Sequence, residues 1–464
     1  MRKHLACAAL AVAVATPLPA QTAAAPKIRI DYTQEVLPNG LTVLYSLDRS
    51  TPVVAVEVMY NVGSKNEQVG RTGFAHLFEH VMFKGSRNVA DGEHWSMLEK
   101  VGGRAGSDIN GTTWTDRTNY FEQVPSNYLE LALWLESDRM GTLTETLTKE
   151  KLDNQREVVK NERRQSVDNQ PYGSWFEKMF WHAFPENHPY RHAVIGSMED
   201  LNAASVDDVI SFFKTYYAPN NAVLVIAGDF DLAQAKSLVR KHFSDIPRGP
   251  AVPALRSMTV PPIIGKTQRE VVQDPNAPAP QVYVGFRVPA ARGANGAAVS
   301  VLGTALASGR ASPFFKDLIR EKQIGVAVSS FNFGLIDGAD LLVFQLRGKA
   351  NSNADSLEAA LIDEISRAAD LLTQDGLEQA KASARFSFVN GLQTTGGFGG
   401  RADALAEGFI YYKDPNHVNT VLDDIDKVTL SGLKAMIKER LIPQNRITLV
   451  YVPAKKSASN AGDR

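Results

Sequence analysis

The chain has 464 residues, of which 44% are hydrophobic and 22% are charged. That is enough for two or three domains with cores of ordinary composition. Its 50 basic and 51 acidic residues leave a net charge of −1 and form no long basic run, so neither nucleic acid nor an anionic membrane surface is expected as the main partner.

The first residues have the pattern of a secretory signal peptide. Arg2 and Lys3 precede an apolar run that extends to about Leu18, and small residues follow, so we predict a signal peptide over residues 1–20 with cleavage after Ala20. The run is shorter than the ~18 residues that a membrane-spanning helix needs, and no later segment is long and apolar enough. The only cysteine, Cys7, lies in this segment, so the mature chain relies on its core instead of disulfides. We expect an exported, periplasmic protein without stable membrane insertion.

Residues 73–86, GFAHLFEHVMFKGS, place two histidines and a glutamate in an otherwise apolar helix. His76 and His80 lie one turn apart on one face, where two imidazoles can bind a single Zn²⁺. Glu79 lies beside His80, so its carboxylate can take a proton from a water whose pKa the zinc has lowered. The alternative is two satisfied core histidines with a chance glutamate, but an H-x-x-E-H spacing arises by accident in roughly one such chain per hundred.

Residues 107–122, SDINGTTWTDRTNYFE, follow a Gly-Gly turn and alternate as an edge strand does. An extended peptide can add to such an edge through main-chain hydrogen bonds. This makes Asn110, Gly111, Thr112 and Thr113 candidate substrate-binding residues. For Asn110 the alternative is an ordinary turn asparagine.

Zinc at a hydrolytic site needs a third protein ligand, and the charged helix predicted over residues 149–165 offers one. At ~100° per residue, Val158 and Val159 define the buried face of this helix, and Glu162 falls within roughly 10° of that direction. Gln155 lies on the same face. Glu157 belongs to a wholly polar stripe that is typical of a solvated surface, so the periodicity selects Glu162.

Three further histidines, His182, His188 and His192, lie in the segment WHAFPENHPYRHAVIG. Two prolines interrupt any helix there, so no pair of ligands shares a regular face. We expect a structural segment instead of a second metal site. Farther along, TTGGFGG at residues 394–400 follows a helix and lacks a downstream Lys-Ser/Thr, so we expect a flexible connection instead of a phosphate loop.

The two halves of the chain resemble each other. Residues 205–228 and 429–452 both begin with a helix-capping hydroxyl residue, continue as an amphipathic helix, stop at a proline and enter a β-branched strand, which indicates an internal duplication. A proline-rich stretch at residues 246–265 separates the halves. The mixture of helices with hairpin-like strand neighbours predicts an α+β fold. The predicted division is a signal peptide at 1–20, a zinc-binding domain at 28–247, a linker at 248–267, a homologous domain without the zinc motif at 268–454 and a flexible tail at 455–464.

H-x-x-E-H is the inverted zinc motif, and together with the glutamate that ends QREVVKNE it makes the chain resemble the pitrilysin/insulysin family of metallopeptidases. GGRAGSDINGTTWTDRTNYFE, NHPYRHAVIGSMEDL and LIREKQIGVAVSS extend the match over essentially the whole mature chain. The resemblance implies that His76, His80 and Glu162 bind one Zn²⁺, that Glu79 is the general base and that Asn110 lies at the substrate edge. It also implies two homologous α/β sandwich domains, each a mainly antiparallel sheet covered by helices.

Two departures from the family pattern bear on activity. Gln155 stands where the family commonly has a glutamate, and a neutral amide can orient a ligand but adds no charge. Pro313 and Ala327 stand where active members offer an arginine and a tyrosine to the substrate carbonyl, and such donors stabilise developing oxyanion charge. Because half-length bacterial relatives pair as dimers, the resemblance suggests a heterodimer with a related chain that carries the Arg/Tyr pair. A homodimer that uses Arg310 or Arg320 is the alternative.

The sequence therefore predicts a zinc endopeptidase that acts on short or unfolded peptides. Two other functions stay open: a structural or assembly subunit without proteolysis, and a peptide-binding module that holds zinc without turnover. The complete set of zinc-site residues favours the enzyme, whereas Gln155, Pro313 and Ala327 favour the alternatives.

Overall fold

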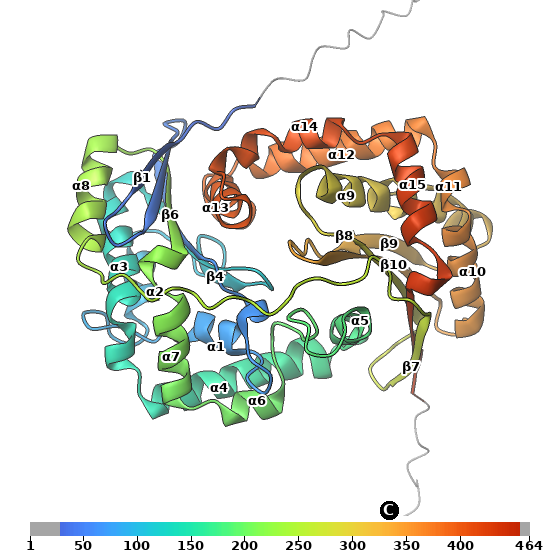
Figure 1. The fold of residues 1–464 in the computed structure, drawn as a ribbon, viewed down its shortest axis with the longest axis horizontal. Coiled ribbons are helices and arrows are strands. Elements are labelled where there is room, and N and C mark those ends of the chain that lie inside the picture. The colour runs from blue at the N-terminus through green and yellow to red at the C-terminus, as the bar shows by residue number, and fades with distance from the viewer. Residues whose placement is uncertain (1–27, 455–464) are drawn as a thin grey trace, which may run out of the picture.

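The computed structural model describes residues 28–454, so the predicted signal peptide (1–20) and the predicted tail (455–464) lie outside the described residues. Within the described part, two β-sheets lie side by side and each is flanked by helices (Figure 1). One sheet is built from residues 33–228 and the other from residues 268–453. The proline-rich segment at 246–265 passes from one half to the other (Figure 1).

The N-terminal sheet has six strands in the order β1-β2-β6-β3-β5-β4. Their bounds are β1 Thr33–Val36, β2 Thr42–Leu47, β3 Val53–Tyr60, β4 Ile109–Thr113, β5 Thr118–Pro125 and β6 Ala222–Gly228. Neighbouring strands are antiparallel except β2 and β6, which are parallel. The sheet ends at β4, which confirms the edge strand predicted within residues 107–122.

The C-terminal sheet has five strands in the order β7-β11-β8-β10-β9. Their bounds are β7 Gln268–Asp274, β8 Gln281–Pro289, β9 Ala327–Asn332, β10 Ala339–Arg347 and β11 Arg446–Pro453. The single parallel pair is β7 with β11. Without β1, the N-terminal sheet has the same strand order and directions, so the predicted duplication and the mainly antiparallel sheets are confirmed.

The helices fall in both halves of the chain. In the N-terminal half they are α1 Phe74–Val81, α2 Glu93–Lys100, α3 Leu129–Thr146, α4 Lys149–Arg163, α5 Trp175–Ala183, α6 Met198–Ala203, α7 Val206–Tyr216 and α8 Leu232–Phe243. In the C-terminal half they are α9 Gly293–Ala307, α10 Ala354–Ser366, α11 Ala368–Leu371, α12 Gln374–Gly391, α13 Arg401–Tyr412, α14 Val421–Asp426 and α15 Leu430–Arg440. Within residues 28–454, none of them is both long and apolar enough to span a bilayer.

The duplicated segments have the predicted local structure. Ser205 Oγ accepts a hydrogen bond from the Asp208 amide (3.1 Å) at the start of α7, and Thr429 Oγ1 accepts one from the Gly432 amide (3.1 Å) at the start of α15. Each helix is followed by a 3₁₀ turn that begins with a proline and leads into β6 or β11. Capping and proline placement thus reproduce one helix-to-strand unit twice.

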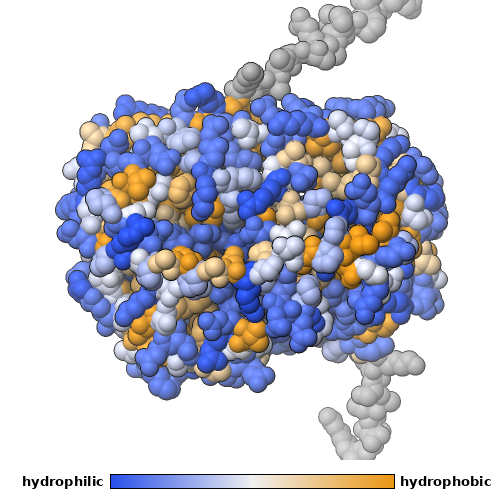
Figure 2. All heavy atoms as spheres, in the orientation of Figure 1, coloured by the Kyte–Doolittle hydropathy of each residue, from blue (hydrophilic) through white to orange (hydrophobic). Residues whose placement is uncertain are grey.

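Two helices cover the sheet of the opposite half (Figure 1). Helix α13 packs on β3 and β6, where Leu405 and Ala406 join a core with Met59 and Val225. Helix α5 packs on β8 and β11 within a second shared core. The remaining faces of the two sheets have cores of their own. On the face drawn in Figure 2, hydrophilic residues predominate and apolar residues form small groups, as expected when the large apolar faces are buried.

Candidate metal centre

Contacts from outside the helix hold the first turn of α1. Gly73 precedes the helix with φ +87°, and a Cβ at this position would come within 2.9 Å of the Ile195 carbonyl oxygen. The buried carboxylate of Glu67 accepts hydrogen bonds from the amides of Gly73 (2.9 Å) and Ala75 (2.8 Å). The first amides of a helix have no acceptor within the helix, so Glu67 satisfies two of them and fixes where α1 begins.

The three predicted zinc ligands lie together. Glu162 Oε2 is 3.6 Å from His76 Nε2 and 3.3 Å from His80 Nε2, and the ligand atoms of all three residues lie within 4.8 Å of one another. Tetrahedral zinc with bonds of ~2.1 Å separates its ligand atoms by about 3.4 Å. Two imidazoles and one carboxylate are also a donor set that zinc takes in hydrolytic sites, so the residues present fit Zn²⁺.

Glu162 reaches the histidines because α4 packs against α1. The buried residues of α4 are Leu152, Gln155 and Val159, and Glu162 follows at helical spacing, three residues after Val159. The prediction that Val158 lies on the buried face is wrong, since 41% of this residue is exposed. The buried face of α4 contains Val159, and Val158, one residue earlier on the helix, points about 100° away from it.

The two other polar residues singled out on α4 differ in their surroundings. Gln155 is buried, but its amide donates to Asn154 Oδ1 (2.8 Å), and within residues 28–454 no hydrogen bond joins it to a predicted zinc ligand. Its role in orienting a ligand stays a prediction. Glu157 is exposed and pairs with Lys160 (2.7 Å), as expected for the polar stripe.

The electrostatic surroundings favour the ligand forms of these side chains. Burial lowers the pKa of His76, which keeps its imidazole neutral. The hydrogen bond with His80 lowers the pKa of Glu162. Neutral imidazole and ionised carboxylate are the forms that bind a metal ion.

Glu79 is held against the edge strand. Thr113 Oγ1 donates a hydrogen bond to Glu79 Oε2 (2.7 Å), and a Cβ at Gly111 would lie 3.0 Å from Glu79 Cγ, so β4 passes directly beside the carboxylate. Side chains alternate along a strand, so Asn110 and Thr112 lie on the opposite face of the sheet from Gly111 and Thr113. The substrate-binding role of these four residues stays a prediction.

The histidines of the 182–192 segment do not converge. His182 Nε2 lies 2.8 Å from Glu270 Oε2, and His188 Nε2 lies 3.1 Å from a main-chain carbonyl oxygen. His192 Nδ1 lies 3.5 Å from Glu67 Oε2, behind the carboxylate that holds the first turn of α1. These contacts agree with the structural role predicted for the segment.

A second cluster of metal-type ligands escaped the sequence analysis. His94, Glu122 and Glu136 are fully buried and bring their ligand atoms within 4.8 Å of one another. Arg139 donates to Glu136, and its guanidinium lies over two aromatic rings at 4.9 and 4.5 Å from their centroids. Because Glu136 already forms a buried ion pair with Arg139, we interpret this carboxylate as paired with the guanidinium.

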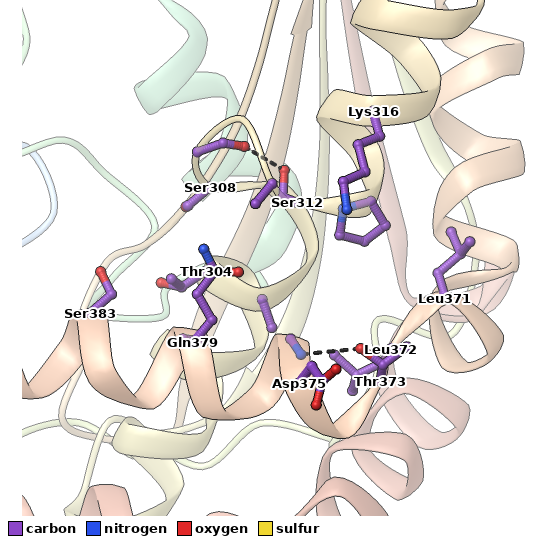
Figure 3. Close-up of a pocket in the computed structure, with 16 residues that line it drawn as sticks. Thr304, Ser308, Ser312, Lys316, Leu371, Leu372, Thr373, Asp375, Gln379 and Ser383 are labelled. Atoms are coloured by element: carbon purple, nitrogen blue, oxygen red, sulfur yellow. Dashed lines mark hydrogen bonds between the residues drawn. The ribbon is translucent and has the colours of Figure 1, made fainter. Parts of the chain in front are cut away.

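Pro313 and Ala327, which the family resemblance places where an arginine and a tyrosine are expected, lie in the C-terminal half. Pro313 borders a cavity of about 480 Å³ between α9 and α12 (Figure 3), and Ala327 begins β9. The lining of this cavity has one carboxylate, from Asp375, and one amine, from Lys316. Arg310 and Arg320 are both exposed to solvent.

Comparison with known proteins agrees with this geometry. The family model described as Insulinase (Peptidase family M16) matches residues 42–196, and the one described as Peptidase M16 inactive domain matches residues 203–384. Zinc protease PqqE of Helicobacter pylori is 30% identical over 385 residues, which cover 81% of this chain and 83% of that protein.

Solved structures give the same result. The crystal structure of a protease from Helicobacter pylori superposes with a TM-score of 0.84 at 27% identity, over 92% of this chain and 100% of that one. The first half of the periplasmic protease PqqL from Escherichia coli shares the fold, with a TM-score of 0.71 at 19% identity over 94% of this chain and 96% of that one. Two matching domain models, a full-length relative and the shared fold show that the chain belongs to the insulinase-type (pitrilysin-like) zinc peptidase family M16.

Proposed function

We propose that this chain is a zinc-dependent endopeptidase that hydrolyses short or unfolded peptides, with one Zn²⁺ held by His76, His80 and Glu162. The observation that carries the proposal is that these ligand atoms converge. Glu79, on the same helix α1 as the two histidines, faces the edge strand β4. A metal-binding group, a carboxylate base and a peptide-binding edge are then adjacent.

Zinc, when bound, supplies the Lewis acidity that lowers the pKa of a coordinated water and polarises a carbonyl group. β4 is an edge strand of the sheet, and it binds the peptide in extended form through main-chain hydrogen bonds. Glu79, oriented by Thr113, accepts a proton from the attacking water at a carboxylate oxygen. It then delivers this proton to the nitrogen of the departing amine.

We propose that Pro313 and Ala327 stand at the positions of the Arg/Tyr pair expected in active relatives, and that a related chain completes the oxyanion-stabilising group in a heterodimer. A homodimer that uses the exposed Arg310 or Arg320 is the second possibility. We also propose export to the periplasm. This rests on the sequence of residues 1–20 and agrees with the periplasmic location of the PqqL protease that shares the fold.

The test is hydrolysis of a quenched, unstructured peptide by the purified mature chain, alone and with its paralogue. We expect Glu79→Gln to lower kcat by about 10²–10⁴-fold, because a general base contributes that much. Glu79→Gln should keep one zinc per chain by metal analysis, whereas Glu162→Ala should lose it. Glu79-dependent cleavage by the chain alone would refute the need for a partner. If the zinc-loaded protein does not cleave the peptide even with the related chain present, the proposal that this chain is an endopeptidase is wrong.

A non-catalytic role in binding or assembly is the second candidate, and the residues at 313 and 327 favour it. The C-terminal half also matches the model described as an inactive domain. In that case the zinc-loaded wild-type chain and its Glu79→Gln variant should bind unstructured peptide equally well, and no combination of chains should show turnover.

A further inference from the structure

The glycine-rich loop Thr394–Gly400 lies on the N-terminal sheet, although it belongs to the C-terminal half. The Gly396 amide donates to Gln123 Oε1 (3.1 Å), and a Cβ on Gly396 would come within 2.5 Å of the Ala55 Cβ. The Gly399 amide donates to Asp403 Oδ2 (2.8 Å) at the start of α13. These contacts attach the loop to the sheet surface, so it does more than connect two helices.

The loop presents one large apolar side chain to solvent. Phe398 is 58% exposed, and only an edge-to-face contact with Phe121 (centroids 5.1 Å apart) joins its ring to another aromatic ring in the described residues. The flanking Gly397 and Gly399 have φ of +80° and +67°, conformations that favour glycine. They let the main chain turn at the sheet while the ring of Phe398 projects from it.

Strand register places Phe398 beside the proposed substrate edge. Phe121 on β5 is directly opposite Asn110 on β4, so the two side chains share the sheet face on which Phe398 lies. A Cβ on Gly397 would lie 3.5 Å from the Ser107 carbonyl oxygen, so the loop extends to the chain segment just before β4. Glu79 faces the other side of the same strand.

A peptide strand added to β4 would alternate its side chains between these two faces. Those on the Glu79 face lie towards the zinc ligands. Those on the Asn110 face lie on the side of the sheet that carries the loop. The loop spans from Phe121 on β5 to the Ser107 carbonyl just before β4, and the added strand would lie one further strand spacing, ~4.8 Å, beyond β4. Phe398 does not belong to the hydrophobic core under α13, so packing in that core does not account for an aromatic residue at this position.

We propose that Phe398 is a specificity-determining residue that contacts a large apolar side chain of the peptide bound along β4, on the face turned away from Glu79. The preferred substrates are then extended peptides with an aromatic or large aliphatic residue at that position. That the ligand is a peptide rests on the function proposed above. The contact with Phe398 affects binding affinity, which can be measured without peptide cleavage.

The experiment uses the zinc-loaded full-length mature chain with Glu79→Gln, so that peptide binds without being cleaved. Fluorescent Ser/Gly-rich peptides carry one Phe that is moved along the peptide position by position, and affinities are read by anisotropy. At the best position we expect Phe398→Ala to reduce the preference for Phe over Ser about 3- to 10-fold. Phe398→Leu should keep most of it. Phe386→Ala, which removes a 71% exposed phenylalanine of α12, is the matched control and should change nothing.

Equal preferences in the Phe398→Ala and Phe386→Ala proteins would overturn the proposal, as would the absence of peptide binding. A Phe398→Ala protein with altered oligomeric state in sedimentation but unchanged preference would also overturn it and assign the ring to an interface between chains. Hydrolysis is assayed separately with Glu79 intact. If cleavage is absent while Phe398→Ala still removes the preference in binding, the proposed function fails and this inference stands.

Discussion

The carboxylate of Glu79 depends on a residue from a different element, the hydroxyl of Thr113 at the end of β4. The H-x-x-E-H spacing puts Glu79 on the same turn as His80, but it does not say which way the carboxylate points. Thr113 holds it beside β4, so the proposed general base and the proposed peptide-binding strand are coupled through one hydrogen bond of 2.7 Å.

Replacing Thr113 by valine tests this coupling, since valine has the same shape without the hydroxyl. A hydrogen bond to a charged group contributes about 1.5–3 kcal/mol, so kcat should fall about 10-fold or more while KM and zinc content change little. Thr113→Ser should restore most of the rate. Steady-state kinetics on a quenched peptide measures this, and a Thr113→Val protein as fast as wild type would show that Thr113 does not orient the base.

Among the elements, α13 is joined to the N-terminal sheet by buried polar groups as well as by its apolar face. Asn119 Nδ2 on β5 donates to Glu57 Oε1 on β3 (2.8 Å) and to Asp403 Oδ1 on α13 (3.3 Å). Burial, followed by the charge of Asp403, raises the pKa of Glu57 well above its usual range. Arg117 is the nearby cation that partly opposes this shift.

The stability of this contact should depend on pH. Glu57 stays protonated in the folded chain at pH values where the unfolded chain has ionised it, so its contribution is full below the unfolded pKa and is lost as pH rises towards the folded pKa. Glu57→Gln cannot ionise. We expect its Tm relative to wild type to increase by a few degrees between pH 5 and pH 8. A Tm difference that is the same at both pH values would show that folding does not raise the pKa of Glu57.

At the scale of the whole molecule, each half contributes a helix that covers the sheet of the other: α5 packs on the C-terminal sheet and α13 on the N-terminal sheet. The folding of each half therefore depends on the other. Without α13, the face of β3 and β6 that carries Met59 and Val225 would be exposed to water. Without the C-terminal sheet, the apolar residues of α5, including Met179 and Phe180, would lose their core. The predicted linker at 248–267 therefore separates two similar halves of the sequence, but two of the hydrophobic cores contain residues from both halves.

This arrangement predicts how fragments behave. Residues 28–247 expressed alone should aggregate or lack a cooperative unfolding transition, because a large apolar face is uncovered. Co-expression with residues 248–464 as a separate chain should recover a soluble, cooperatively folded complex. Calorimetry of the intact chain should give one main transition. Fragment 28–247 unfolding cooperatively at the Tm of the full chain would contradict this prediction.

Local sequence determined much of the candidate metal site and of the fold. His76, Glu79 and His80 lie within one turn of a single helix, so their spacing alone places them together. Capping residues, prolines and β-branched runs likewise specify each helix-to-strand unit over a few residues, which is why the duplication was predictable.

Tertiary structure decided the rest, because contacts between distant residues depend on how elements pack. Periodicity selected Glu162, yet it also put the exposed Val158 on the buried face, and only the packing of α4 on α1 brings Glu162 to the histidines. The bond from Thr113 to Glu79 and the position of Phe398 beside β4 join segments 34 or more residues apart. No periodicity connects such segments. The core of the N-terminal half brings α1 to β4, and the shared core under α13 brings the loop that carries Phe398 to the sheet.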